Sequence, residues 1–365
     1  MLNVLLIGAG QCGNRILDAV NKESFGGGKL SKYYSWQKFP TRVETIAVNT
    51  AVNDLKELKY TKAKDRIHIP YLHGVGANRN VGKQCFIDNK DYVMRAVAER
   101  GDFDVAFIAT STAGGTGSSF TPLLVSALKE RYSFPIYVFA VLPFREEGTI
   151  YLQNTAFCLK ELRESGAEGI ILVDNQFLRH LGSDIETAYD RINEAIAERI
   201  LFLFKSLDSE MMMVTDLGDF KTVMTSGIRL ATVGFSRGDK EISVKSAIRN
   251  SLSSSGLLFS LDAYTESSRA MIIIEADKKY LNIDDITTEV DRLTTGAGHV
   301  FKGILVRNKA YPSVLSVLAI TSGKELDNLY DAAVDAVERE RRKKEDAARQ
   351  VESMMGKIGK LEAQY

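Results

Sequence analysis

The sequence predicts an α/β fold in which a parallel sheet is followed by a long helix, an α+β segment and a C-terminal helix. Short apolar runs alternate with helical patterns through the first half of the chain. Uninterrupted apolar runs separated by helices are typical of parallel strands that are buried on both faces. The runs are residues 4–7, 44–49, 104–110, 136–142 and 169–174.

A long central helix is predicted after the fifth run. Ser183 and Glu186 have the S-x-x-E spacing of a capping box, which marks the start of a helix. Apolar residues then recur every three or four positions, so that one face stays buried for roughly six turns. They are Ile185, Ala188, Ile192, Ile196, Ile200 and Leu203.

The remaining chain predicts a second α+β domain with a small sheet of its own. Strands are expected at 269–276, 300–308 and 313–321, and a helix at 284–293. The predicted division is residues 1–182 for the parallel-sheet domain, 183–206 for the central helix, 207–322 for the second domain and 323–365 for a helical extension.

The helical extension has a short heptad seam and a charged run. The seam is expected to pack on the second domain; the alternative is that it docks an unknown partner or an adjacent filament. We interpret the run 338–346 as a solvated face with i,i+4 pairs, Glu338–Arg342 and Glu340–Lys344, in preference to a basic docking patch. The seam residues are Ala347, Val351, Met354, Ile358 and Leu361.

Composition excludes several classes of function. Lys+Arg and Asp+Glu both total 47, so no overall field attracts nucleic acid or an anionic membrane, and near-zero net charge permits self-association. Cys12, Cys85 and Cys158 form no C-x-x-C pair, which indicates a reduced, cytoplasmic chain. The run 136–144 is too short to span a bilayer, so direct membrane insertion is not expected.

The first glycine motif raises two nucleotide hypotheses. Gly8, Gly10 and Gly13 spell G-x-G-x-x-G directly after the first apolar run. A dinucleotide site of the Rossmann type also needs an acid at the end of the second strand, but that strand ends in Asn49 and Thr50. The P-loop pattern G-x-x-x-x-G-K-[ST] does not occur in the chain either.

A second glycine-rich loop, residues 110–120, also follows a buried run and opens a helix. Glycines leave backbone N–H groups free to converge on an oxyanion at the positive end of that helix, and Thr116 and Ser118 add hydroxyl donors. Two such loops on neighbouring strand ends fit a di- or triphosphate better than a dinucleotide. The glycines are Gly114, Gly115 and Gly117.

These motifs resemble the tubulin/FtsZ superfamily over about residues 1–325. GGTGS at 114–118 matches its signature loop, and GQCGN at 10–14 looks like the tubulin N-terminal loop. The long C-terminal helix is more similar to the archaeal tubulin-like CetZ group than to typical FtsZ. The resemblance implies a GTPase fold that binds GTP or GDP, with Mg²⁺ held mainly through phosphates and water and with no metal-ligating residues of its own.

The resemblance assigns the phosphate end of the site to three segments. The segment 74–82 is similar to the FtsZ loop that senses the γ-phosphate, and Arg79 could add charge there. Cys12 is expected to contact phosphate through its backbone, without thiol chemistry. The implied residues are Gly10, Gln11, Cys12, Gly13, Asn14, Gly76, Ala77 and Asn78, together with Gly114, Gly115, Thr116, Gly117 and Ser118.

The resemblance also implies a sugar and base site. Glu147 matches the ribose-binding segment, although FtsZ has an arginine where this chain has Tyr151. Asn175 resembles the tubulin base-reading turn. Tyr189 and Asn193 match the pair that stacks on guanine and hydrogen-bonds it, and their spacing of four places both on one helical face.

The predicted catalytic acids lie elsewhere. Asp216 and Asp219 match the two carboxylates of the FtsZ catalytic loop, with Val214 where that loop has asparagine. The central helix spans about 30 Å, which separates these acids from the nucleotide of their own chain. The resemblance therefore implies head-to-tail self-assembly into filaments, hydrolysis completed in trans, and a cytoskeletal role, with cell-shape control favoured. A non-catalytic nucleotide-binding scaffold and an NAD-dependent oxidoreductase are the alternatives.

Overall fold

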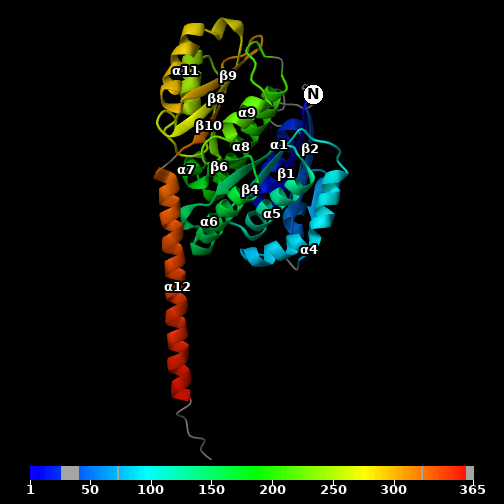
Figure 1. Ribbon diagram of the computed structural model, residues 1–365, viewed down its shortest axis with the longest axis vertical. Helices are drawn as coiled ribbons and strands as arrows, with labels where there is room; N and C mark the ends of the chain where they lie inside the picture. The colour runs from blue at the N-terminus through cyan, green and yellow to red at the C-terminus, as the bar shows by residue number, and fades with distance from the viewer. Residues whose placement is uncertain (26–40, 72–73, 210, 322–323, 359–365) are drawn as a thin grey trace, which may run out of the picture.

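A computed structural model describes residues 1–25, 41–71, 74–209, 211–321 and 324–358. One sheet runs through the body, in the order β3-β2-β1-β4-β5-β6-β7-β10-β8-β9 (Figure 1). Neighbours from β3 to β7 are parallel, β10 is antiparallel to β7 and β8, and β9 is parallel to β8. The strands are β1 (Asn3–Ala9), β2 (Arg42–Asn49), β3 (Arg66–His68), β4 (Val105–Ser111), β5 (Ile136–Leu142), β6 (Gly169–Asp174), β7 (Leu230–Ser236), β8 (Ser267–Ala276), β9 (His299–Val306) and β10 (Ser313–Ile320).

The helices connect these strands and cover both faces of the sheet. They are α1 (Gly10–Phe25), α3 (Val52–Lys56), α4 (Arg79–Ala98), α5 (Gly115–Arg131), α6 (Thr149–Glu164), α7 (Asn175–Leu178), α8 (Ile185–Leu207), α9 (Leu217–Met224), α10 (Val244–Leu252), α11 (Ile283–Ala297) and α12 (Lys324–Ile358). Short 3₁₀ turns lie at Ala63–Asp65, Arg145–Glu147, Arg179–Leu181 and Lys278–Tyr280.

Side-chain alternation along β1 shows how the sheet is sandwiched. Val4 and Leu6 point to one face and pack in a cluster with residues of α1 and α8, whereas Leu5 and Ile7 point to the other and pack with residues of α4, α5 and α6. All four side chains are fully buried. The predicted parallel sheet with two covered faces is therefore confirmed.

The prediction of a separate small sheet is wrong. Strand β7 joins the two halves, because Ile170 of β6 pairs with Leu230 and Val317 of β10 pairs with Val233. Sequence analysis missed β7 because Gly234 interrupts its apolar run. A Cβ at Gly234 would lie 1.8 Å from the Ser251 carbonyl oxygen, so a close backbone approach requires glycine there. The domain limits given above stay a prediction.

The start of α8 differs by one residue from the predicted capping box. Asp184, and not Ser183, is the N-cap: its Oδ1 accepts from the Thr187 N–H at 2.9 Å, and the Thr187 hydroxyl oxygen accepts from the Asp184 N–H at 3.1 Å. Asp is as good an N-cap as Ser, so sequence alone could not choose between neighbours. The predicted stripe from Ala188 to Leu203 is buried; the Ile185 side chain is outside the described part.

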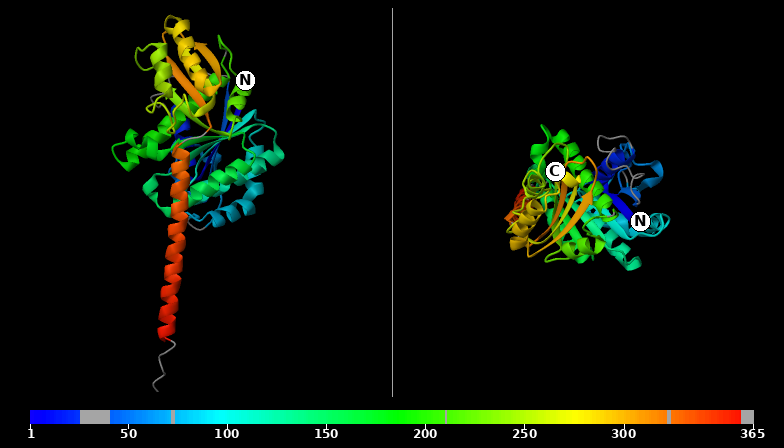
Figure 2. Two further views of the ribbon diagram at one scale, coloured as in Figure 1. Left: turned by 60° about the vertical axis from the view of Figure 1, so that its left-hand side comes forward. Right: turned by 90° about the horizontal axis from the view of Figure 1, so that it is seen from above.

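The expectation that the heptad seam packs on the second domain is also wrong. Leu329, Ala333 and Ala336 are buried where α12 runs beside α6, but the helix then projects from the body (Figures 1 and 2). Val351 and Met354 are 59% and 63% exposed. The Ile358 side chain and Leu361 lie outside the described residues.

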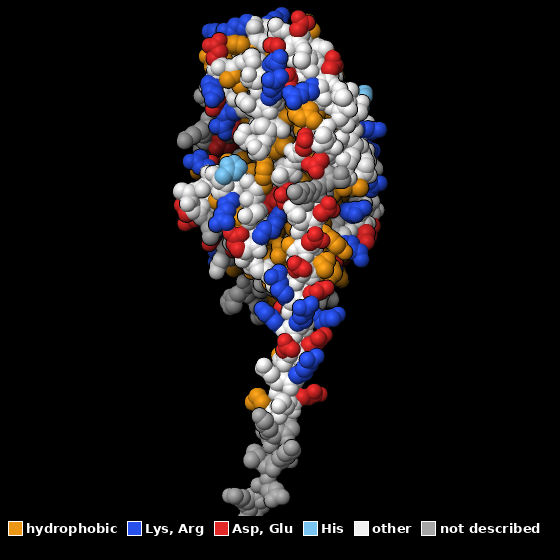
Figure 3. All heavy atoms as spheres, turned by 90° about the vertical axis from the view of Figure 1, so that its left-hand side faces the viewer, with side chains coloured by type: hydrophobic (Ala, Val, Ile, Leu, Met, Phe, Trp, Pro, Cys, Tyr) orange, Lys and Arg blue, Asp and Glu red, His pale blue; other side chains and the backbone are white. Residues whose placement is uncertain are grey.

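The charged run of α12 agrees with its interpretation as a solvated face. Glu338–Arg342 and Glu340–Lys344 form i,i+4 ion pairs at 3.5 and 3.8 Å, and charged side chains of both signs are mixed along the projecting helix (Figure 3). In the described part of the chain, no helix combines the length and the apolar character needed to cross a bilayer.

Candidate functional site

A pocket of about 570 Å³ opens at the carboxyl ends of β1, β2 and β4, where parallel sheets bind ligands. It gathers most of the residues proposed from sequence, although they come from distant parts of the chain. The predicted residues that line it are Gly10, Gln11, Cys12, Gly76, Ala77, Gly114, Gly115, Thr116, Gly117, Glu147, Asn175, Tyr189 and Asn193.

The glycine loops meet backbone to backbone. Gly10 has a φ of +72°, and a Cβ on it would lie 2.8 Å from the Gly117 nitrogen. A Cβ on Gly115 would lie 1.8 Å from the Gly76 carbonyl oxygen. Three loops therefore interlock at distances that only glycine permits, and α5 begins at Gly115 with its first N–H groups free for an anion.

Several predicted phosphate residues do not line the pocket. Gly13 allows close packing, since its Cβ would lie 2.1 Å from the Ala109 carbonyl oxygen. Asn14 is fully buried. The Asn78 side chain caps α4 by accepting from the Asn80 and Val81 N–H groups. In these positions the three residues can shape the loops without touching a ligand.

Ser118 and Arg79 also face away from the pocket. The Ser118 hydroxyl is fully buried and donates to the Gly114 carbonyl, and it accepts from Arg79 Nε at 3.1 Å. The Arg79 guanidinium is paired with Glu161. The expectation that Arg79 adds charge at the phosphates is therefore wrong. Thr116 keeps its place in the pocket wall, and its hydroxyl lies 2.8 Å from that of Thr50.

Glu147 and Tyr189 organise the side of the pocket where the sugar and base are predicted to lie. Glu147 Oε1 accepts from the Phe144 N–H at 2.9 Å and from the Tyr189 hydroxyl at 3.1 Å. Burial, and next the Glu147 carboxylate, raise the pKa of Tyr189, so it stays a neutral donor. Its ring meets the Phe144 ring edge to face at 5.3 Å, which fixes the ring plane.

Asn175 provides a test of whether the pocket fits a polar ligand. Its side chain is buried in the pocket wall, and Oδ1 has no hydrogen-bond partner among the described residues. Leaving a buried acceptor unsatisfied costs free energy, so a ligand that donates a hydrogen bond is favoured there. Asn193 is also buried and lines the same pocket. The amide side chains of Asn175 and Asn193, which can both accept and donate, fit a nucleobase with an amide-like edge.

Sequence analysis missed a group of polar pocket residues at the end of β2. Asp54 accepts from Asn49 Nδ2 at 3.0 Å and from Gln11 Nε2 at 3.2 Å. Burial outweighs these hydrogen bonds and raises the pKa of Asp54. The sequence carries a signal for this group, because Asn49 ends a buried parallel strand and Thr50 follows it, although our sequence analysis considers these two residues only against a dinucleotide site. Arg15 also lines the pocket.

Cys12 lies half-buried in the pocket wall. Desolvation first, and then the Glu147 carboxylate, raise the pKa of its thiol to about 12. The thiolate is therefore scarce at neutral pH, which agrees with a backbone role and no thiol chemistry.

The two acids lie outside the pocket. Asp216 is the exposed N-cap of α9: its Oδ1 accepts from the Asp219 N–H at 3.0 Å, while Asp219 Oδ2 accepts from the Thr215 hydroxyl at 3.1 Å. From Asn193 in the pocket to the end of α8 at Leu207 the helix rises about 21 Å, and the acids follow that end.

Together, the fold and the pocket define a nucleotide-binding α/β protein with a backbone-lined phosphate cradle. Residues 3–183 match the family model "Tubulin/FtsZ family, GTPase domain". The chain is 56% identical over the full length of both chains to the tubulin-like protein CetZ of Methanothrix thermoacetophila. It belongs to the tubulin/FtsZ family, and CetZ proteins are among its relatives there.

Solved structures agree with this assignment. CetZ from Methanosaeta thermophila strain DSM 6194 is 53% identical and matches with a TM-score of 0.89, covering 98% of each chain. A GTPγS-bound protofilament of CetZ2 from Haloferax volcanii matches with a TM-score of 0.79 over 93% of this chain and 100% of that one. At 24% identity, that second likeness shows the fold alone.

Proposed function

We propose that this protein is a cytoplasmic GTPase that assembles head-to-tail into protofilaments and completes GTP hydrolysis at the interface between subunits. Its proposed role is cytoskeletal, in the control of cell shape. GTP occupies the pocket, with its phosphates on the loops of Gly10, Gly76 and Gly114–Gly117. Glu147 accepts from the ribose hydroxyls, and Asn175, Tyr189 and Asn193 hold guanine.

The separation of the pocket from the acids is the observation that carries the proposal. Among the described residues, the acids that line the pocket, Asp54 and Glu147, each already accept hydrogen bonds from neighbouring residues, whereas Asp216 is exposed beyond α8. Met212 and Val214 beside it are 61% and 74% exposed. An exposed acid with an apolar rim is suited to a subunit contact, and a heterologous contact of this kind propagates into a filament.

The proposed chemistry needs little from the protein beyond positioning. The loops orient the phosphates, and Asp216 or Asp219 of the neighbouring subunit orients and polarises the attacking water. Bound Mg²⁺ would offset the negative charge of the phosphates. It would be held mainly by phosphate and water, with the Asp54 carboxylate at the pocket wall available to accept from a coordinated water.

Assembly is tested by light scattering and sedimentation with GTP, GDP and a non-hydrolysable GTP analogue. GTP and the analogue are expected to produce sedimentable polymer, and turnover per molecule should rise with protein concentration because each site needs a neighbour. A strictly monomeric protein with the same specific activity at every dilution would contradict the proposal.

Asp54 gives a prediction about pH. Its raised pKa means that ionising it costs folding free energy, a cost that is absent at low pH and sets in as pH rises through the folded pKa. Ligand-free Asp54→Asn is therefore expected to unfold at a higher temperature than the wild type at pH 7. The difference in unfolding temperature between the two proteins should disappear at a pH of about 4, the ordinary pKa of an Asp side chain.

Thermal unfolding at both pH values tests this, with Asp88→Asn, an exposed acid of α4, as the control. Asp54→Asn should also lose part of the stabilisation that Mg²⁺ and nucleotide give the wild type. An Asp54→Asn protein that is less stable than the wild type at pH 7 would show that the carboxylate is not strained by burial.

A non-catalytic scaffold is the second candidate. Val214 is 74% exposed at the position where the FtsZ loop has a polar asparagine. The attacking water would therefore lack one polar contact at this position. Tyr151 lines the pocket where FtsZ has an arginine. Nucleotide that copurifies but never turns over, in polymer or out of it, would favour this candidate.

A further inference from the structure

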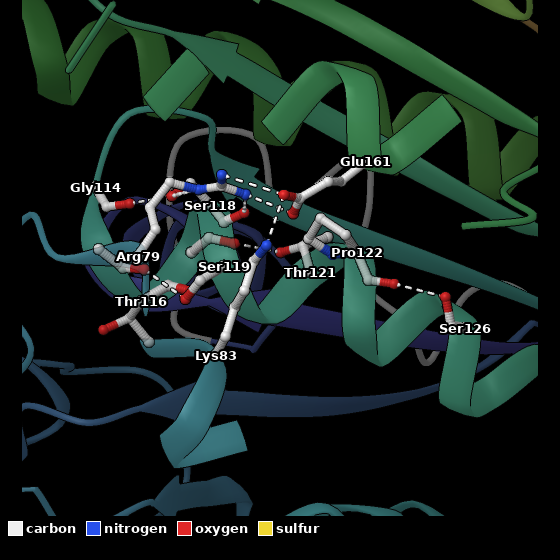
Figure 4. A network of polar contacts seen from close by, with 12 residues as sticks. Arg79, Lys83, Gly114, Thr116, Ser118, Ser119, Thr121, Pro122, Ser126 and Glu161 are labelled. Atoms are coloured by element: carbon white, nitrogen blue, oxygen red, sulfur yellow. Dashed lines mark hydrogen bonds and ion pairs between the residues drawn. The ribbon is translucent and has the colours of Figure 1, made fainter. Parts of the chain in front are cut away.

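Arg79 connects the pocket loop to two other helices. It is the first residue of α4, directly after the loop 74–78, and it is 8% exposed. Its Nη2 donates to the Ser118 carbonyl oxygen at 3.0 Å and to Glu161 Oε2 at 2.7 Å. Figure 4 shows the guanidinium lying between Ser118 and Glu161, which belong to α5 and α6.

Glu161 is a fixed anion in this network. Lys83 Nζ lies 2.6 Å from its Oε1, the oxygen that also accepts from Arg79 Nη1 at 3.4 Å (Figure 4). Burial alone would raise the pKa of Glu161, but the hydrogen bonds from Arg79 and Lys83 outweigh it and hold that pKa below its ordinary value. The carboxylate therefore stays charged at neutral pH and anchors the first turn of α4 to α6.

Asn154 of α6 makes a second link between the same loops. Its buried Nδ2 donates to the Ala77 carbonyl oxygen at 3.0 Å and to the Ala113 carbonyl oxygen at 2.8 Å. Ala77 and Ala113 lie in the two loops that flank the phosphate end, and both line the pocket. Asn154, Glu161 and Arg79 do not line it. Helix α6 thus holds both loops from behind.

We propose that Arg79 is a positioning residue that, with Glu161 and Asn154, sets the spacing between the loops 74–78 and 113–118 and so favours GTP over GDP. The inference rests on the proposed binding of GTP in this pocket. The loops touch at Gly76 and Gly115, whereas the base residues belong to other elements. Loosening the loops therefore removes contacts with the terminal phosphate and leaves the contacts with the base.

Binding calorimetry with GTPγS and with GDP, both with Mg²⁺, tests the inference. Arg79→Gln is expected to weaken GTPγS binding about tenfold, the value of a lost charge-assisted hydrogen bond, and GDP binding by less than about threefold. The affinity of Arg79→Lys for GTPγS should lie between those of Arg79→Gln and the wild type. The control is Lys90→Gln, which breaks the Lys90–Glu130 pair at 2.6 Å between α4 and α5, outside the pocket.

Asn154→Ser removes the second link without changing a charge, and it keeps the test open if Arg79→Gln does not fold. It is expected to shift the ratio of GTPγS to GDP affinity in the same direction. Equal losses for both nucleotides, or losses no larger than those of Lys90→Gln, would overturn the positioning role. A wild type that binds neither nucleotide would instead overturn the proposed function.

Discussion

Asp216→Asn is expected to reduce GTP turnover about 100-fold or more at protein concentrations that assemble, since a general base contributes factors of this size. GTP affinity should stay unchanged, because Asp216 is outside the pocket. Asn is chosen because it caps helices as well as Asp does, so α9 keeps its start while the charge is lost. Initial rates of phosphate release in sedimentable polymer are the measurement.

Two further proteins make this experiment specific for action in trans. Asp216→Ala should lose the same activity and also about 1 kcal/mol of stability, because it removes the cap. Mixing Asp216→Asn with a protein that folds but cannot bind nucleotide should restore activity. In random filaments about one interface in four would combine an intact pocket with an intact acid. No recovery in copolymer, or normal turnover in Asp216→Asn alone, would contradict the trans mechanism.

The second large effect is expected from a pair of adjacent glycines. A Cβ at Gly115 would lie 1.8 Å from the Gly76 carbonyl oxygen, so Gly115→Ala forces the loops apart. Gly114 has a φ of −69° and no atom within 4 Å of its Cβ position, so Gly114→Ala places a methyl group in pocket space without straining the fold. Both variants should lose nucleotide affinity by about 100-fold or more, since backbone donors must approach the phosphates closely.

Only Gly115→Ala should also lose stability, by about 1–3 kcal/mol, the usual cost of overpacking. Thermal unfolding without nucleotide separates the two variants, and calorimetry with GTPγS measures their affinities. Gly114→Ala then supplies the folded, non-binding partner for the mixing experiment. If Gly114→Ala bound GTPγS as tightly as the wild type, the loop would not be the phosphate cradle.

Much of the fold could be predicted because its signals are local. The strands β5 and β6 were predicted to the residue, since solid apolar runs bounded by polar turns specify buried parallel strands. The glycine loops were found because each follows such a strand. The rule that ligands sit at the carboxyl ends of parallel strands then placed Gly10 and Gly114–Gly117 at one edge, where the pocket lies.

The predictions that failed depended on which neighbour a side chain meets. A hydroxyl in a glycine-rich loop was expected to face phosphate, but Ser118 Oγ faces the Gly114 carbonyl and Arg79 Nε. Asp54 was overlooked because its burial comes from loops that are remote in sequence, such as that of Gln11. An apolar seam on α12 predicted packing, but the body beside it ends near Ala336.

The sequence by itself determined the parallel strands, the central helix, the two glycine loops and the chemistry that they offer to a phosphate. These features can be recognised from the spacing of apolar residues and the positions of glycines in short stretches of sequence, because backbone conformation is set locally. Only the tertiary structure decided that β7 joins both halves into one sheet and that α6 holds the loops 74–78 and 113–118 through Asn154 and Glu161. Those outcomes depend on close contacts between distant segments, which no local pattern encodes.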